Sequence, residues 1–201
     1  MDKKEKIETL KEKMKKDMSL PLREGATNLV FGEGDCNTEI LFIGEGPGYW
    51  EDQKARPFVG NSGSLLNKLL QTIKLNREDV FITNVVFFRP PNNRDPLPEE
   101  INAFKPYIDG IIDTIDPKII VTLGRFSMAK FIPNVFISSV HGKIFNIKWD
   151  DKDKVVIPMY HPAAALRNGN VMNMIKNDFL KIPEILNEVI SNIIVDQMTL
   201  I

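Results

Sequence analysis

Cysteine, excess positive charge and long apolar runs are all scarce in this chain, and each shortage excludes a class of protein. The single cysteine, Cys36, excludes an internal disulfide and leaves no group of thiolates that could hold zinc or an iron–sulfur cluster. The 26 Lys and Arg residues are balanced by 27 Asp and Glu residues, which leaves a net charge of −1. Binding to nucleic acid would therefore depend on a local basic patch and not on the field of the whole molecule.

Apolar runs stay well short of the roughly 18 residues that a membrane span requires, and the lysine-rich start lacks the apolar core of a signal peptide. The composition, 43% hydrophobic and 26% charged over 201 residues, is typical of a globular protein with a substantial core. The sequence has no internal repeat and no low-complexity linker. We therefore expect one domain over residues 1–201, in a soluble, intracellular (cytoplasmic) monomer without contact to a membrane.

Strand and helix patterns alternate along the chain. Four apolar segments with the length of strands lie at residues 40–43, 80–86, 118–124 and 155–159. Helical periodicity is found at residues 2–18, 65–73, 98–115, 126–131 and 171–193. This alternation favours an α/β fold with three α/β/α layers around a central, mostly parallel four-stranded sheet.

Weaker patterns lie outside these segments. Residues 28–34 are expected to form a short strand or hairpin. Residues 144–149 show a weak alternation of apolar and polar side chains, which predicts an edge strand paired as a hairpin with residues 155–158. The first helix, residues 2–18, is amphipathic, because Ile7, Leu10, Met14 and Met18 recur every three or four positions. We interpret it as a helix docked on the domain, in preference to an arm that contacts DNA.

A glycine-rich turn follows the first predicted strand. Residues 44–48 read Gly-Glu-Gly-Pro-Gly, and glycines around a proline let the backbone bend sharply and approach a flat or anionic ligand. Open α/β sheets bind their ligands just past the carboxyl ends of the strands. Glu45 is the one carboxylate in this turn and the first candidate site residue. A turn of this kind often only connects two elements. It indicates a site only if other candidate residues lie close to it.

Three further residues are candidate partners of Glu45. Phe58 lies in a loop between Pro57 and Gly60, where it would either cover the core or stack on a planar base. Asn84 stands in an apolar strand, where its amide costs free energy unless it pairs with a neighbouring loop or a ligand. His161 precedes Pro162, which is a common place for a structural turn residue. Their shared position at strand ends favours one site.

Four motifs together resemble those of the uracil-DNA glycosylase superfamily, and the match is best to its family 4, the bacterial and archaeal type. The first motif joins residues 44–48 to Glu-Asp at 51–52 and Arg-Pro-Phe-Val-Gly at 56–60. The others lie at residues 83–94, 122–125 and 161–167. The resemblance covers residues 20–180 in the expected order and spacing. Each motif alone is unspecific, but their joint occurrence is highly specific.

This resemblance implies a DNA repair enzyme that hydrolyses the N-glycosidic bond of uracil flipped out of DNA and leaves an abasic site. Phe58 would stack on the uracil, and Gly44 and Gly46 would form the floor of its pocket. Asn84 would bind N3–H and O4 of the base, and His161 would donate to O2. Glu45 would support the oxocarbenium-like sugar, and orient or deprotonate the attacking water. No lysine falls within the motifs, so a monofunctional glycosylase is expected.

The resemblance also implies contacts to DNA outside the base pocket. Ser62 and Ser64 lie at the start of the helix behind Phe58, where Ser62 or Asn61 could cap the helix and free N–H groups favour a phosphate. Arg94 and Arg167 are further candidates for phosphate contacts. Leu166 would be either a wedge that fills the place of the flipped base or a core side chain.

One departure from family 4 concerns its four-iron four-sulfur cluster, which members typically hold on four cysteines. The matching positions here are Asp17, Leu20, Phe88 and Phe104. We therefore expect the fold without the cluster and without any metal. Apolar contacts would replace its hold on the N-terminal segment.

Two other functions stay open at this point. The chain could be a non-catalytic or repurposed nucleic-acid-binding member of the same superfamily, because loss of the cluster indicates divergence. It could also be an α/β enzyme that acts on free nucleotides. The joint presence of Glu45, Asn84 and His161 favours catalysis on DNA, because a binding protein would not need all three.

Overall fold

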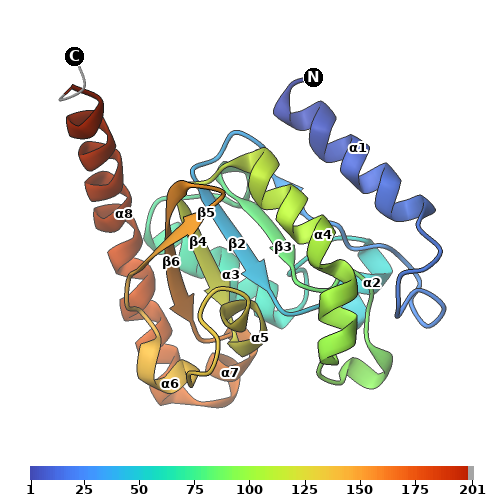
Figure 1. Cartoon of the computed structure of the whole chain (residues 1–201). Coiled ribbons are helices and arrows are strands. Elements are labelled where there is room, and N and C mark those ends of the chain that lie inside the picture. The colour runs from blue at the N-terminus through green and yellow to red at the C-terminus, as the bar shows by residue number, and fades with distance from the viewer. Residues whose placement is uncertain (199–201) are drawn as a thin grey trace.

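Six strands form one mixed sheet in the computed structural model, which describes residues 1–198 (Figure 1). The four central strands are parallel, in the spatial order β3 (Phe81–Asn84), β2 (Ile40–Gly44), β4 (Ile119–Leu123) and β6 (Lys152–Met159). These are the four strands predicted from sequence. Two further strands, β1 (Glu33–Gly34) and β5 (Phe145–Trp149), pair antiparallel at the two edges of the sheet. They confirm the short strand predicted within residues 28–34 and the edge strand predicted beside residues 155–158, and they bring the whole sheet to six strands.

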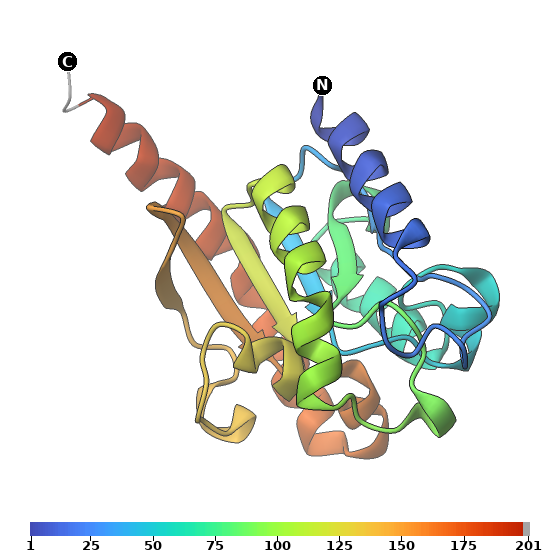
Figure 2. The same ribbon diagram turned by 45° about the vertical axis from the view of Figure 1, so that its right-hand side comes forward.

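Helices cover both faces of this sheet, which confirms the predicted three layers (Figure 2). The longer helices are α1 (Lys3–Lys16), α3 (Asn61–Thr72), α4 (Pro98–Ile115) and α8 (Gly169–Met198). The shorter ones are α2 (Tyr49–Lys54), α5 (Arg125–Ala129), α6 (Ile137–Val140) and α7 (Pro162–Arg167), with 3-10 turns η1 (Arg77–Asp79) and η2 (Pro91–Asn93). No helix in residues 1–198 combines the length and the apolar character needed to cross a membrane.

Strand β2 explains how the two cores form. Successive side chains of a strand point to opposite faces, so Phe42 packs with α3 and α8 while Leu41 and Ile43 pack with α1 and α4. The rings of Phe42 and Phe179 stack with centroids 5.8 Å apart. Because both faces are covered, the strand is apolar throughout, as is usual for parallel strands.

Helix α1 lies along α4, as the amphipathic pattern predicted, but it is shorter than predicted. Asp2 caps it and accepts a hydrogen bond from the Glu5 N–H at 2.8 Å. Its buried residues are Ile7 and Met14. Met18, assigned to the apolar face, lies beyond the helix end and is 76% exposed.

The start of α3 differs from the expected cap. Gly60 is the N-cap residue, and neither Asn61 nor Ser62 caps the helix with its side chain. The tight turn before the helix accounts for the difference. A Cβ atom at Gly63 would lie 1.7 Å from the carbonyl oxygen of Phe58, so the loop packs directly on the first helical turn.

Candidate functional site

A cavity of about 570 Å³ opens at the carboxyl ends of the parallel strands. Glu45, Phe58, Asn84 and His161 all line it, so the structure brings together the four residues that sequence reasoning grouped. The strand register accounts for part of this. Gly44 pairs with Asn84 across β2 and β3, and Leu123 pairs with Met159, so these strands end at the same edge of the sheet.

Phe58 forms an aromatic wall of the cavity. It is 6% exposed, and its ring stacks on His161 with centroids 5.6 Å apart and planes 29° apart. Its φ of +50° is unusual for a residue with a side chain. Gly44 makes room for the ring, because a Cβ atom there would lie 2.5 Å from it. A glycine at position 44 is therefore a steric requirement of this wall.

Two charged side chains hold the Phe58 loop in place. Arg77 donates to the carbonyl of Phe58 at 2.9 Å and also to that of Pro57. Glu51 accepts from the N–H groups of Val59 and Gly60, both at 2.9 Å. These bonds to the backbone offset the strain of the turn and fix the aromatic ring beside the cavity.

Asn84 ends β3 and is 1% exposed. Its Oδ1 atom has no hydrogen-bond partner. Two other buried side-chain atoms in the described chain also lack one, Arg23 Nε and Thr122 Oγ1. Only Asn84 among these three lines the cavity at the strand ends. A buried polar atom without a partner costs about 1–3 kcal/mol, whereas the neighbouring Thr83 donates to the Phe31 carbonyl at 2.7 Å. The amide of Asn84 is thus available to a ligand.

His161 is held in one tautomer by the helix that follows it. It is the N-cap of α7, and its Nδ1 atom accepts a hydrogen bond from the Ala163 N–H at 3.1 Å. The ring proton therefore sits on Nε2. Burial lowers the pKa of His161 to about 4, because the charged imidazolium is costly away from water. His161 is a neutral hydrogen-bond donor at physiological pH.

Glu45 follows β2 and lies over Gly124. Gly124 has a φ of +104°, and a Cβ atom there would lie 2.2 Å from Glu45 Oε1. The carboxylate is 3.5 Å from the Phe126 N–H, which is a weak contact. Burial raises the pKa of Glu45, because the charged carboxylate loses hydration. Such a weakly bonded carboxylate is suited to act as a base or to face a developing positive charge.

Some of the predicted DNA-contacting residues line the cavity, and others lie outside it. Ser62 and Arg167 line it, and Gly46 lies in its floor against Val86. Ser64 does not; it lies on the exposed side of α3, in a shallow hollow that it shares with Leu166. Leu166 is 48% exposed and is therefore not a core side chain.

Arg94 lines the cavity too, but a carboxylate matches its charge. Glu100 accepts from its two terminal nitrogens at 2.8 and 2.5 Å. This bidentate contact raises the pKa of Arg94 and lowers that of Glu100. A phosphate contact by Arg94 stays a prediction.

Sequence reasoning missed several residues of this site. It assigned no role to Tyr49, Trp50 or Glu51, although all three line the cavity. Two consecutive aromatic residues directly after a glycine-rich turn were a usable signal. The sequence around Arg77 contains no such signal, because Arg77 acts by donating to the backbone of a loop that lies 20 residues away in sequence.

Three of the four positions that match the family's cluster cysteines belong to one apolar core cluster. Leu20, Phe88 and Phe104 are 6%, 3% and 0% exposed, and the two rings are 6.1 Å apart. Asp17 accepts from the hydroxyl of Tyr107 at 2.6 Å, which raises the pKa of Tyr107 to about 12 through burial and this bond. Aromatic rings and a leucine are not iron ligands, so these residues do not fit an iron–sulfur cluster.

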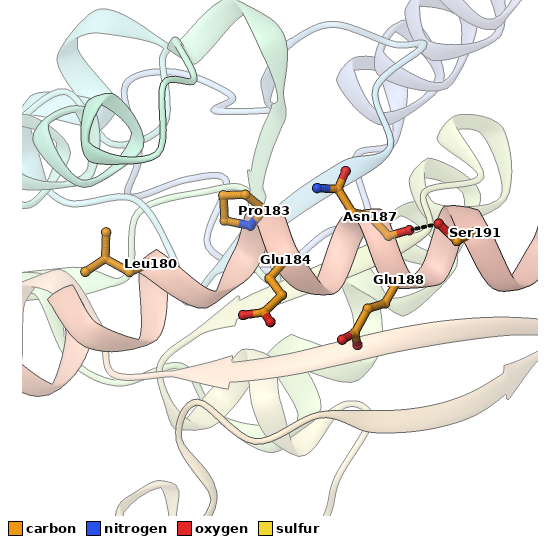
Figure 3. A pocket seen from close by; sticks show the side chains of 6 residues that line it. All are labelled: Leu180, Pro183, Glu184, Asn187, Glu188 and Ser191. Carbon is orange, nitrogen blue, oxygen red and sulfur yellow. Dashed lines mark hydrogen bonds between the residues drawn. The ribbon is translucent and has the colours of Figure 1, made fainter.

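A second hollow lies along α8, away from the strand ends (Figure 3). Its side chains come from successive turns of one helix, and the bond drawn among them joins the Ser191 hydroxyl to the Asn187 carbonyl at 2.7 Å. It measures about 670 Å³ and shares no residue with the strand-end cavity. Because its polar groups do not converge, the strand-end cavity is the candidate site.

Comparison with known proteins identifies the family of this chain. The type-4 uracil-DNA glycosylase of Sulfurisphaera tokodaii is 47% identical over 89% of this chain and 84% of its own length. Those of Archaeoglobus fulgidus and Thermotoga maritima are 47% and 45% identical, each over 82% of this chain and 85% of their own length. The model of the uracil DNA glycosylase superfamily matches residues 31–184, a span that contains all four strand-end residues. The chain belongs to the uracil DNA glycosylase superfamily.

Proposed function

We propose that the chain is a uracil-DNA glycosylase that hydrolyses the N-glycosidic bond of a uracil flipped out of DNA. The observation that carries this proposal is the buried, unpartnered amide oxygen of Asn84 beside the stacked rings of Phe58 and His161. A base inside a duplex is inaccessible to an enzyme, so the nucleotide must leave the stack first. A pocket with an aromatic wall and a convergent amide suits such an extruded base.

Asn84 would select uracil by its hydrogen-bonding edge. Its oxygen accepts from N3–H, and its NH₂ group donates to O4. Cytosine presents an acceptor at N3 and a donor at C4, so it would leave both groups of the amide unpaired. Sites of this type reject the wrong ligand strongly, because buried polar groups without partners are costly.

His161 would donate from Nε2 to O2 of the uracil. As the C1′–N1 bond breaks, its electron pair goes to the base, and the negative charge grows at O2. A fixed, neutral donor stabilises this charge more in the transition state than in the ground state. The bond from the Ala163 N–H to Nδ1 keeps the donor proton on the required nitrogen.

Glu45 would act at the sugar. A carboxylate there stabilises the positive charge on the oxocarbenium-like ring, and it orients or deprotonates the water that adds to C1′. The products are a free uracil and an abasic sugar. No lysine lines the cavity within the described chain, which supports hydrolysis in preference to a Schiff-base lyase step.

The DNA would be held by residues around the cavity. The proposed phosphate contacts are Ser62, Arg94 and Arg167, which line the cavity, and Ser64, which lies outside it. Leu166 is proposed as the wedge, since apolar side chains inserted between bases stabilise a distorted duplex. Its 48% exposure supports this role.

We further propose that the enzyme works as a monomer and without an iron–sulfur cluster. The residues of the proposed chemistry, Glu45, Phe58, Asn84 and His161, meet within one chain, so the first point requires no residue from a second copy. Buried Leu20, Phe88 and Phe104 support the second, because they join the segment after α1 to the rest of the protein where a cluster would otherwise do so.

The test is incubation of the protein with a single strand that contains one uracil, followed by alkali. Abasic sites break in alkali, so cleavage at the uracil position is expected, with none in a matched strand that carries thymine. Binding without cleavage would instead indicate a non-catalytic family member. Release of uracil from free deoxyuridine in preference to DNA would indicate a nucleoside-processing enzyme.

A further inference from the structure

Helix α2 carries two exposed aromatic side chains at the rim of the cavity. Tyr49 is 48% exposed and Trp50 is 57% exposed, and both line the cavity. Their rings meet edge to face with centroids 5.1 Å apart. Neighbouring large apolar side chains left open to water usually mark an interaction site. The roles of Phe58, Asn84, Glu45 and His161 leave this pair without a function.

Hydrogen bonds to neighbouring loops hold helix α2, and with it Tyr49 and Trp50, in place. Glu51 ties α2 to the Phe58 loop through the N–H groups of Val59 and Gly60, each at 2.9 Å. The next residue, Asp52, is 1% exposed and accepts from the N–H groups of Thr27 and Asn28 at 2.9 and 3.0 Å. Two buried or half-buried carboxylates therefore fix this short helix, so its aromatic residues have a defined position.

This position is next to the proposed uracil. A Cβ atom built at Gly60 would lie 3.7 Å from Cδ1 of Trp50, which places the indole beside the loop that carries Phe58. Phe58 is the wall of the base pocket, so Trp50 and Tyr49 extend that wall outward. A nucleotide next to the flipped one has to pass this part of the rim.

Cations flank both rings. The guanidinium of Arg89 lies 5.2 Å from the ring centre of Tyr49, and the ammonium of Lys54 lies 6.0 Å from that of Trp50. The side-chain partner of Arg89 is the neutral amide oxygen of Asn93 at 2.7 Å. Aromatic platforms interleaved with cations are the usual means of binding single-stranded nucleic acid.

We propose that Tyr49 and Trp50 form a stacking ledge for the DNA base adjacent to the flipped uridine, with Arg89 and Lys54 against its phosphates. This inference rests on the proposed function. A base that stacks on the ledge has left its own partner, so the ledge favours single-stranded or locally opened DNA over closed duplex. Continuity with the uracil pocket and the positive flanks favour DNA as the occupant over a protein.

Tryptophan fluorescence tests the ledge directly, because the chain has two tryptophans. Trp149 lies in β5 and bonds to Asp113 through Nε1 at 2.6 Å, so Trp149→Phe leaves Trp50 as the reporter at the cavity. A uracil-free single strand should quench this emission strongly, and a closed duplex weakly. Unchanged emission at saturation, with binding verified by anisotropy, would overturn the proposal.

Kinetics provide the second test. Stacking on an aromatic side chain accounts for a factor of about 5 to 150 in affinity per base. Trp50→Ala should therefore raise KM for a uracil-containing single strand by a factor in this range, leave kcat within about twofold, and affect duplex less. Trp50→Phe should restore most of the affinity.

Phe136→Ala is the matched control, because Phe136 is an aromatic residue that is 82% exposed and does not line the cavity. The Phe136→Ala variant should change neither KM nor kcat. If Trp50→Ala behaves like this control in an active protein, the ledge is wrong, and a surface for a protein partner is the remaining interpretation. Absence of uracil release by the unaltered protein would sink the proposed function, whereas the fluorescence test of the ledge would still decide the inference.

Discussion

Burial acts in opposite directions on the pKa values of Glu45 and His161. It raises the pKa of Glu45 and lowers that of His161 to about 4, because in both cases the charged form loses hydration. For His161 the result is the neutral donor that O2 of uracil requires. For Glu45 the result is a carboxylate that is a stronger base than an exposed one.

The activity should therefore fall at acid pH because of Glu45. Its carboxylate takes up a proton as the pH falls through its raised pKa, above the ordinary 4.5, whereas His161 stays neutral down to about pH 4. A plot of kcat/KM against pH should show one acid limb. Glu45→Gln should remove this limb and lower the rate by a factor of about 10² to 10⁴. An acid limb that persists unchanged in Glu45→Gln would assign it to another group.

Asn84→Asp should shift the base preference toward cytosine. A protonated carboxyl group can donate to N3 of cytosine and accept from its amino group, which reverses the pattern of the amide. Release of uracil and cytosine from matched single strands measures the change, with Asn84→Ala as the control that loses uracil without gaining cytosine. The same preference in wild type and Asn84→Asp would refute the role of Asn84 in base selection.

Sequence reasoning found the residues that break an apolar pattern. Asn84 in a buried strand and His161 after one are visible because a polar group there needs a reason. Glu51 and Arg77 could not be found in this way, since they act on backbone groups of the Phe58 loop that only the folded chain brings to them.

At the scale of elements, the N-terminal segment is joined to the sheet by packing. Phe104 of α4 is fully buried, and its ring lies 5.6 Å from Phe87 and 6.1 Å from Phe88. Arg23 lies 4.8 Å above Phe88 and donates to the carbonyls of Met14 and Lys15 at the end of α1. This aromatic contact stands where the resemblance places the iron–sulfur cluster.

Phe104→Ala should therefore lower the free energy of unfolding by about 3–5 kcal/mol, the usual cost of removing a buried aromatic ring. Amide exchange in α1 should rise more than exchange in β2 and β4, because the contact joins α1 to the sheet. Denaturant unfolding and hydrogen exchange measure the two effects. Phe136→Ala serves as the exposed control, and an equal loss of stability in both variants would contradict the structural role of Phe104.

The four central strands could be predicted because they are buried on both faces and read as continuous apolar runs. The edge strands carry weaker signals. Strand β1 has two residues, and β5 alternates between half-buried and exposed positions. The place of β5 beside the next strand, β6, was still predicted, whereas β1 pairs with β3 about 50 residues away, which local patterns do not encode.

At the scale of the whole molecule, the chain is nearly neutral, so its contact with DNA is local. Arg94 and Arg125 pair with Glu100 and Asp95, which leaves Arg89, Lys54 and Arg167 as the main proposed phosphate contacts. Three contacts to a single strand predict a slope of about −2 in a plot of log affinity against log salt concentration. A slope several times steeper would mean that a larger basic surface is involved.

We propose a uracil-DNA glycosylase in which an apolar contact takes the place of the iron–sulfur cluster. The most direct measurement is single-turnover release of free uracil from a uracil-containing single strand, using protein whose iron content has been determined. We expect about one uracil per DNA strand from iron-free protein, at a rate that a chelator does not change. No uracil above the protein-free control, or release only by iron-containing protein, would contradict it.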